Sequence, residues 1–325
     1  MATNTTANQT AHVKAAYDQA IFMALRPHLH FDQVADVEPT MQTQPGTSVT
    51  FTINSDLAVA TTPLDESTDV DPATLSSTTA SVTIVEYGNA AEATEKLLGV
   101  AFDAPPFDKG AAERIGWNAG VSQDSIAAGV LYGGSNVTYG TGGTTDPTST
   151  ATIQTDDILT AHDVRIVVAQ LYTASVPTWM DGYYRGFIHP HVALDYREET
   201  GAGNWRSFQE AFAAAGTEGA TPLIKGFLGE YEGVAWVQTP RAQLVADAGS
   251  DAVDQYGTLV IGRQALAKAY SKSVSGPHPQ VRIRPPVDRL LRFHSVGWYW
   301  LGGYGRFREE SIRRIESSSS LGTNV

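Results

Sequence analysis

The most regular pattern in the chain is an alternation of apolar and polar residues in two short segments. In residues 46–53, every second side chain from position 49 onward is apolar, with threonine between. Residues 80–87 repeat the alternation. A period of two is typical of strands with one buried face, so each segment is predicted to be a half-buried strand. The apolar positions are Val49, Phe51, Ile53, Val82 and Ile84.

The segment between these strands, residues 54–79, is long, polar and acidic. A structureless loop of that length is uncommon inside a compact domain, and an isolated two-stranded ribbon is marginally stable in water. We therefore expect residues 42–87 to form an arm that projects from its own subunit and is covered by another chain. The expected apolar contacts between subunits are Val49, Phe51, Ile53, Val82 and Ile84. The alternative is an ordinary sheet in which residues 54–79 are a disordered insertion.

A long helix is predicted over residues 109–131, where apolar side chains recur at helical spacing. Gly116 and Gly120 each weaken such a helix by about 1 kcal/mol relative to alanine, so a break at residues 120–122 is compatible with the pattern. Shorter helices are predicted at 11–25, 92–98 and 205–212.

The most distinct helix signal is a capping box formed by Thr160 and Asp163. The apolar face that follows recurs at intervals of three and four residues, and Pro177 marks the end of the segment. The glycine-rich residues 133–152 before it lack the Gly-Lys-Ser/Thr ending of a phosphate loop, so a flexible connection is predicted.

Several short segments in the second half of the chain alternate between strand and helix patterns. Strands are predicted at 183–188, 234–237, 256–261, 280–284 and 290–301, and helices from Pro190 and over 263–272. Residues 306–317 are compatible with either a strand or a short helix.

Composition limits the class of protein. The 325 residues are enough for about two domains. The chain has no cysteine, which excludes disulfides and thiolate metal sites, and it has no apolar run long enough to cross a membrane. A net charge of −13 argues against binding nucleic acid through a basic surface.

The charge is distributed unevenly. No lysine or arginine occurs between Arg26 and Lys96, whereas the C-terminal part is rich in arginine. Opposite charges of this kind can meet between copies of a subunit, or they can be two solvated faces of one molecule. If they meet, we expect acidic arm residues to face basic residues near the C-terminus. The candidates are Asp65, Glu66, Asp69, Arg306, Arg308, Arg313 and Arg314.

Candidate chemistry is sparse. The sequence has no zinc-protease motif, nucleophile elbow or dinucleotide fingerprint. His189 and His191 with Asp195 are metal-ligand residue types, as are His28 and His30, but no third ligand has recognisable spacing around His28. Asp195 and Arg197 are more simply a surface pair on a helix or a contact with a partner. We therefore predict no enzyme activity and no cofactor, with a metal-dependent enzyme as an alternative.

Three motifs occur in order: Asp181-Gly182-Tyr183-Tyr184, then a helix segment beginning His189-Pro190-His191, then Gly229-Glu230-Tyr231-Glu232-Gly233-Val234. Together they resemble the major capsid proteins of tailed bacteriophages, in the branch found in N-four-like phages. The helix segment carries Asp195-Tyr196-Arg197, in which Tyr196 replaces the leucine usual in that family. The resemblance covers most of the chain from about residue 15.

The resemblance implies an α+β fold of the Hong Kong 97 type. It suggests an N-terminal arm, an extended β-hairpin loop, a long spine helix with a peripheral domain, an axial domain and a C-terminal return to the peripheral domain. The expected boundaries are 1–37, 38–87, 88–175, 176–283 and 284–325. Some relatives of this fold cross-link through a lysine in the extended loop, but that loop has no lysine here.

The implied function is structural. Copies would assemble in the bacterial cytoplasm into pentamers and hexamers of an icosahedral virion shell, enclosing double-stranded DNA without sequence-specific binding and without contact with a membrane. Expected partners are further copies, a separate scaffolding protein, a portal and a decoration protein. An encapsulin-like compartment that stores a cargo enzyme is the alternative with the same fold.

Overall fold

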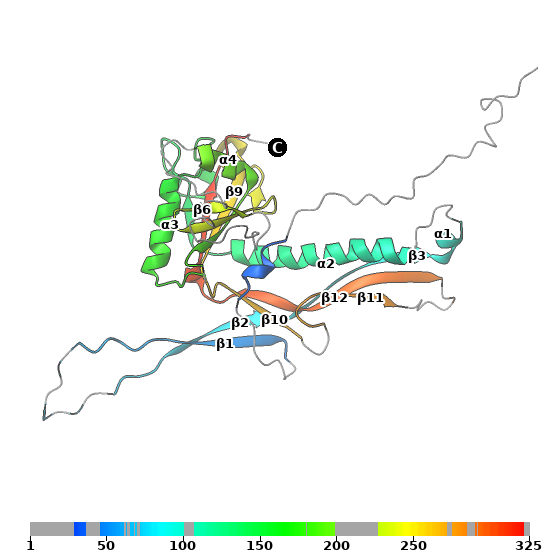
Figure 1. Cartoon of the computed structure of the whole chain (residues 1–325), viewed down its shortest axis with the longest axis horizontal. Helices are drawn as coiled ribbons and strands as arrows, with labels where there is room; N and C mark the ends of the chain where they lie inside the picture. The colour runs from blue at the N-terminus through cyan, green and yellow to red at the C-terminus, as the bar shows by residue number, and fades with distance from the viewer. Residues whose placement is uncertain are drawn as a thin grey trace, which may run out of the picture.

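The computed structural model describes residues 29–36, 46–61, 63, 66–67, 69, 72–100, 107–179, 181–198, 227–271, 275–284, 290 and 292–321. The molecule has an elongated body, a compact lobe at one end of that body, and a two-stranded ribbon that projects past the lobe (Figure 1). The helices predicted at 11–25 and 205–212 lie outside the described residues, as do His28 and Asp65.

The elongated body is a long helix lying along a four-stranded sheet (Figure 1). Its helix α2 (Phe107–Tyr132) is continuous, so the break that the pattern allowed at residues 120–122 is absent. A Cβ at Gly120 would lie 2.9 Å from the Leu29 side chain, so this glycine permits a close approach of another segment. The sheet strands are β3 (Val85–Thr94), β10 (Leu266–Tyr270), β11 (Gln280–Arg284) and β12 (Phe293–Arg306).

Strand β12 is the centre of the body, since β3, β10 and β11 all pair with it in antiparallel fashion. Helix α1 (Glu95–Val100) follows β3 at the far end of the body. The helix predicted at 92–98 therefore begins three residues late, because residues 92–94 still pair with residues 293–295 of β12.

The ribbon consists of β1 (Ser48–Asn54) and β2 (Ser77–Thr83), paired antiparallel from Ser48↔Thr83 to Asn54↔Ser77. The alternation predicted for residues 48–54 is confirmed, with serine, threonine and asparagine exposed and the apolar residues half-buried. The second predicted strand, 80–87, is divided at Ile84, because β2 belongs to the ribbon and β3 to the body sheet.

The compact lobe contains a seven-stranded mixed sheet. Its order is β4-β13-β9-β5-β7-β6, with β8 paired to β9, and the pairs β4/β13 and β5/β7 are parallel. The strands are β4 (Val137–Tyr139), β5 (Tyr184–Ile188), β6 (Phe227–Tyr231), β7 (Val234–Gln238), β8 (Leu244–Val245), β9 (Gln255–Ile261) and β13 (Ile312–Ser317).

Two helices, α3 (Ala161–Thr173) and α4 (Pro190–Glu198), contribute to one hydrophobic core with the lobe sheet. A second core joins the opposite side chains of that sheet to α2 and to β12, so it extends across both parts of the molecule. Short 3₁₀ helices are Asp32–Val34, Thr150–Thr152, Ser250–Ala252 and Glu309–Ser311.

The capping box predicted for α3 is confirmed, because Thr160 and Asp163 exchange side-chain and backbone hydrogen bonds. Asp163 also accepts from the Thr141 hydroxyl at 2.7 Å. The glycine-rich segment is therefore held against α3 and supplies strand β4, and the expectation of a flexible connection at residues 133–152 is wrong.

The helix predicted at 263–272 is also wrong, since residues 266–270 form strand β10. Four of these five residues are buried, including Ala267 and Ala269. Strand β10 pairs along its edge with β12 and is buried on both faces. These interactions override the local helix-compatible spacing.

Sheet membership divides the chain differently from the expected boundaries. Strands β10 and β11, which begin within 176–283, belong to the body sheet, and α3, within 88–175, packs in the lobe. Strand β13, within 284–325, is part of the lobe sheet. The chain thus crosses between body and lobe at residues 133–136, 262–265 and 307–311.

Candidate assembly interface

The base of the ribbon is anchored on its own subunit. Val82 is only 1% exposed and packs with Ala267 and Ala269 of β10. The Phe51 ring meets Phe307 edge-on, with centroids 5.8 Å apart. Val82 was expected at an inter-subunit contact, but its side chain is already covered by its own chain, so that expectation is wrong.

The other apolar ribbon residues are partly covered in the same way. Val49, Phe51 and Ile84 are half-buried against the cluster around Val82, and Ile53 is half-buried two residue pairs beyond Phe51 along the ribbon. Each keeps some surface for a neighbour, but their first role is to fix the direction of the ribbon relative to the body.

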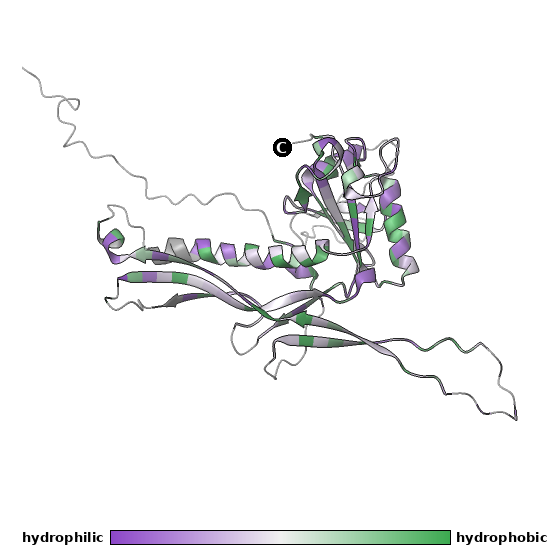
Figure 2. Cartoon of the chain, turned by 180° about the vertical axis from the view of Figure 1, so that it is seen from behind, coloured by the Kyte–Doolittle hydropathy of each residue, from purple (hydrophilic) through white to green (hydrophobic). Residues whose placement is uncertain are grey.

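Beyond Asn54 and Ser77 the ribbon continues without strand pairing and projects away from the lobe and the body (Figure 2). Among its described residues, this distal part exposes the large apolar side chains of Leu57 at 53%, Val59 at 86% and Leu75 at 82%. Glu66 and Asp69 are also exposed. Apolar side chains with this much water contact, next to acidic groups, are typical of a surface that a partner covers.

Two of the four candidate arginines are already paired within the chain. Arg306 binds Glu309 and Arg314 binds Glu316, each at 2.8 Å, and Arg314 also donates to the carbonyl of Tyr132. Arg308 and Arg313 are half-buried and form no ion pair with another described residue. Of this group, these two remain available to an acidic partner.

A second apolar surface lies at the far end of the body, beside α1. Leu97, Val100 and Leu290 are between 58% and 76% exposed. They lie near a pocket of about 430 Å³, which is lined by Thr94, Glu95, Lys96, Arg292 and Phe293. This end therefore combines apolar surface with charges of both signs.

The histidine pair does not form a metal site with Asp195. His189 and His191 stack edge-on at 4.7 Å, and the His191 Nδ1 atom hydrogen-bonds the Tyr256 hydroxyl at 3.0 Å. Asp195 is 4% exposed and accepts from Ser319 Oγ at 2.7 Å and from the Ser320 backbone N–H at 2.9 Å. Among the described residues, no group of three histidine or acidic side chains could hold a metal ion.

Asp195 therefore fastens the C-terminal serines to α4, and the expectation of a surface pair with Arg197 is wrong. Burial, and to a smaller extent the nearby His191, together lower the pKa of His189 to about 4. Both histidines are thus built into the lobe.

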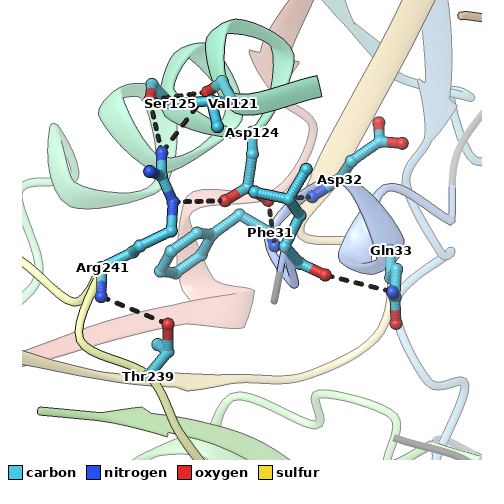
Figure 3. A network of polar contacts seen from close by, with 9 residues as sticks. Phe31, Asp32, Gln33, Val121, Asp124, Ser125, Thr239 and Arg241 are labelled. Atoms are coloured by element: carbon cyan, nitrogen blue, oxygen red, sulfur yellow. Dashed lines mark hydrogen bonds and ion pairs between the residues drawn. The ribbon is translucent and has the colours of Figure 1, made fainter. Parts of the chain in front are cut away.

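The structure brings together one polar network that the sequence patterns did not reveal. Asp124 of α2 is 1% exposed, binds the Arg241 Nε at 3.1 Å, and accepts from the Phe31 backbone N–H at 2.7 Å (Figure 3). Arg241 also donates to the Ser125 hydroxyl at 2.6 Å. The available signal was an acidic residue at position 124 on the apolar face that carries Ala127 and Leu131.

No described helix is both long and apolar enough to span a membrane. A search among curated proteins found no match. Among solved structures, the capsid of Ralstonia phage GP4 is 17% identical with a TM-score of 0.74, and the match covers 98% of each chain. The cyanophage Pam1 capsid is 15% identical with a TM-score of 0.67, over 96% of this chain and 98% of that one.

The capsid of Helicobacter pylori bacteriophage KHP30 is 12% identical with a TM-score of 0.68, over 98% of each chain. These likenesses confirm the expected α+β fold of the Hong Kong 97 type. In sequence, the profile of one family, described as phage capsid protein, matches residues 107–321. That range contains α2, every strand of the lobe sheet and strands β10 to β12 of the body. The chain therefore belongs to the phage capsid protein family.

Proposed function

We propose that copies of this structural capsid protein form pentamers and hexamers that close into an icosahedral head around double-stranded DNA. In this proposal the elongated body is the peripheral domain and the compact lobe is the axial domain. Their strand membership follows the two sheets rather than single stretches of sequence. Each copy would touch several neighbours, so many moderate contacts would add up to a stable shell.

The observation that carries the proposal is the ribbon. Its base is fixed by burial of Val82, while Val59 and Leu75 stand 86% and 82% exposed beyond the paired residues. Two strands alone gain little stability in water, and covering apolar surface contributes about 25 cal/mol per Å². The distal ribbon therefore gains most by lying across the body of an adjacent copy.

Charge supports the same contact. The ribbon carries Glu66 and Asp69, and its sequence has no basic residue. Arg308 and Arg313 lack an ion-pair partner within the described chain and are candidates to receive these acids. Complementary charges of this kind contribute to the register and rate of association more than to raw affinity.

The remaining partners follow from the role in a head. We infer that a separate scaffolding protein, a portal and a decoration protein act with the shell, and that assembly takes place in the bacterial cytoplasm. The net charge of −13 suits a lining that encloses DNA without binding its sequence. No catalytic role and no cofactor are proposed.

The test is reversal of charge on the ribbon. Changing Asp65, Glu66 and Asp69 to lysine should leave a folded subunit, measured by circular dichroism, but prevent shells from forming, measured by sedimentation and negative-stain microscopy. The matched control exchanges the same residues between Asp and Glu, which keeps the charge. Normal shells from the lysine variant would contradict the charge pairing.

A second variant tests the ribbon itself. Replacing residues 55–76 by a short glycine-containing turn keeps β1 and β2 and their contacts with the body. Folded subunits that no longer assemble are the expected result. Shells of normal size and yield from this variant would contradict the role of the ribbon altogether.

A further inference from the structure

Residues 29–36, here called the strap, lie between the lobe and the body without belonging to either sheet. Apart from one turn of 3₁₀ helix at Asp32–Val34, the strap has no regular structure. Its contacts nevertheless reach α2, the lobe sheet, the body sheet and one of the connections that cross between them. This convergence on a single short segment suggests a mechanical role.

The first contact is apolar. The Phe31 side chain is 1% exposed and lies against Tyr132 at the end of α2 and Phe187 of lobe strand β5, with ring centroids 5.9 and 5.0 Å away. Phe31 therefore fills space between a helix of the body and a strand of the lobe.

The second set of contacts is polar and joins the strap to both sides. Asp124 of α2 accepts from the Phe31 backbone at 2.7 Å while it binds Arg241, which follows the lobe strand β7 (Figure 3). Asp32 pairs with the buried Lys268 of β10 at 2.8 Å and accepts from the Tyr304 hydroxyl of β12. The strap thus supplies the counter-charge for a buried lysine of the body.

The third contact is on a crossing connection. Asp36 accepts from the Gln264 backbone N–H with both carboxylate oxygens, at 2.9 and 3.1 Å, and it lies 3.6 Å from Arg263. Gln264 has a φ of +59°, in the left-handed region that costs a non-glycine residue energy and persists only where the surroundings fix it. Such a residue between β9 of the lobe and β10 of the body is suited to act as a hinge.

Two of the three crossing connections also run side by side. Phe307 donates its N–H to the carbonyl of Ala265, and Gly262 donates to the carbonyl of Ser311, both at 2.9 Å. Residues 262–265 and 307–311 therefore form one narrow joint. A joint of two bonded connections permits rotation about a common line, and the strap spans it from Phe187 on the lobe side to Lys268 on the body side.

We propose that the strap is a clamp on this joint, which fixes the angle between lobe and body and whose release lets the lobe rotate while both parts stay folded. The clamp is a conformational device of the single subunit. It is independent of which surfaces meet in a shell, so it does not rest on the ribbon contact proposed above.

The test measures the angle directly. The chain has no native cysteine, so spin labels can be attached to cysteines introduced at two exposed sites, Ala151 of the lobe and Glu92 of the body. Distance distributions between the labels would be recorded by pulsed electron paramagnetic resonance on the unassembled full-length chain. Phe31→Ala removes the apolar contact of the strap, and Asp36→Ala removes its hydrogen bonds to the crossing connection. Gln33→Ala is the matched control, since Gln33 is an exposed strap residue whose side chain bonds only the strap's own Leu29 among the described residues. Its backbone N–H bond to His30 is kept in this variant.

The native chain and Gln33→Ala should give the same narrow distribution, and the two clamp variants should give broader or shifted ones. Hydrogen exchange should remain slow in β9, which shows that the lobe is still folded. If Phe31→Ala does not fold, Asp36→Ala decides the question. A folded Asp36→Ala with the native distribution, or a Gln33→Ala distribution as broad as that of the clamp variants, would overturn the proposal.

Discussion

The α-carbon of Gly303 lies directly against the backbone carbonyl of Thr83, so closely that a methyl group at position 303 would overlap that oxygen. Gly303 is in the central body strand β12, and Thr83 is the last residue of ribbon strand β2. Two positions along, a Cβ at Gly305 would lie 2.7 Å from the Val82 side chain. The base of the ribbon therefore packs directly against the backbone of β12 in its own subunit, where glycines leave room for it.

Gly303→Ala should lift the base of the ribbon and lower the free energy of unfolding by about 1–3 kcal/mol, the usual cost of overpacking. Urea denaturation measures this loss, and microscopy should show few or misshapen shells. Gly129→Ala is the control, because nothing lies within 4 Å of a Cβ there. It should stabilise α2 by up to about 1 kcal/mol. Equal stability of Gly303→Ala and Gly129→Ala would contradict this close packing between the ribbon and β12.

Exposed apolar residues of the distal ribbon should matter for assembly and not for folding. Val59→Ser and Leu75→Ser remove side chains that are 86% and 82% exposed, so the melting temperature of the unassembled subunit should not change. The critical concentration for assembly should rise in light scattering, because apolar surface that the neighbour would cover is lost. Val59→Ile keeps that surface and is the control. Unchanged assembly in the serine variants would remove the apolar part of the contact.

Asp195 should be a stability residue of the lobe. Asp195→Ala leaves the Ser319 hydroxyl and the Ser320 N–H without their buried acceptor, a loss of about 1–3 kcal/mol. Limited proteolysis should cut the C-terminal segment faster in this variant. Arg197→Ala, one residue beyond Tyr196 on the exposed side of α4, should behave like the native chain. Equal proteolysis of both variants is the contrary result.

The lobe should lose stability in acid partly through His189. Burial lowers the pKa of His189 to about 4, below its ordinary value of 6.5, and the neighbouring groups that face it are His191 and Tyr256. The unfolded chain binds a proton more readily between these values. The stabilising contribution is therefore present above pH 6.5 and lost as the pH falls toward about 4.

Melting temperatures at about pH 7 and about pH 4.5 measure this effect. His189→Gln should show a smaller drop on acidification than the native chain, and His162→Gln, an exposed substitution on α3, is the surface control. Carboxylates contribute to the drop in every variant, so the comparison rests on the difference between the two chains. The same drop in the native chain and in His189→Gln would contradict the assignment.

The sequence predicted those elements whose pattern is local. The alternation at Val49, Phe51 and Ile53 set strand β1, and the Thr160–Asp163 capping box set the start of α3. In both cases the spacing of side chains along one segment decides which face is buried, so no distant residue is needed. The capsid resemblance rested on motifs in the lobe, and the family match covers the same part of the chain.

The ribbon contacts and the junction depended on residues far apart in the chain. The sequence pattern places Val82 in the second strand of a projecting arm. It is buried nevertheless, because β10 and the glycines of β12 lie beneath it. Residues 266–270 have helix-compatible spacing, but they form a strand because they pair with the edge of β12.

The polar junction was beyond sequence reasoning for the same reason. Asp124, Arg241 and Phe31 are each unremarkable in their own segments, and they meet only once α2, β7 and the strap are packed together. The sequence by itself thus determined strand β1, the capped helix and the kind of protein. Only the tertiary structure decided which apolar groups are buried and which charged groups are paired inside the subunit, and which stay exposed to its neighbours. The reason is that burial depends on segments that are distant along the chain.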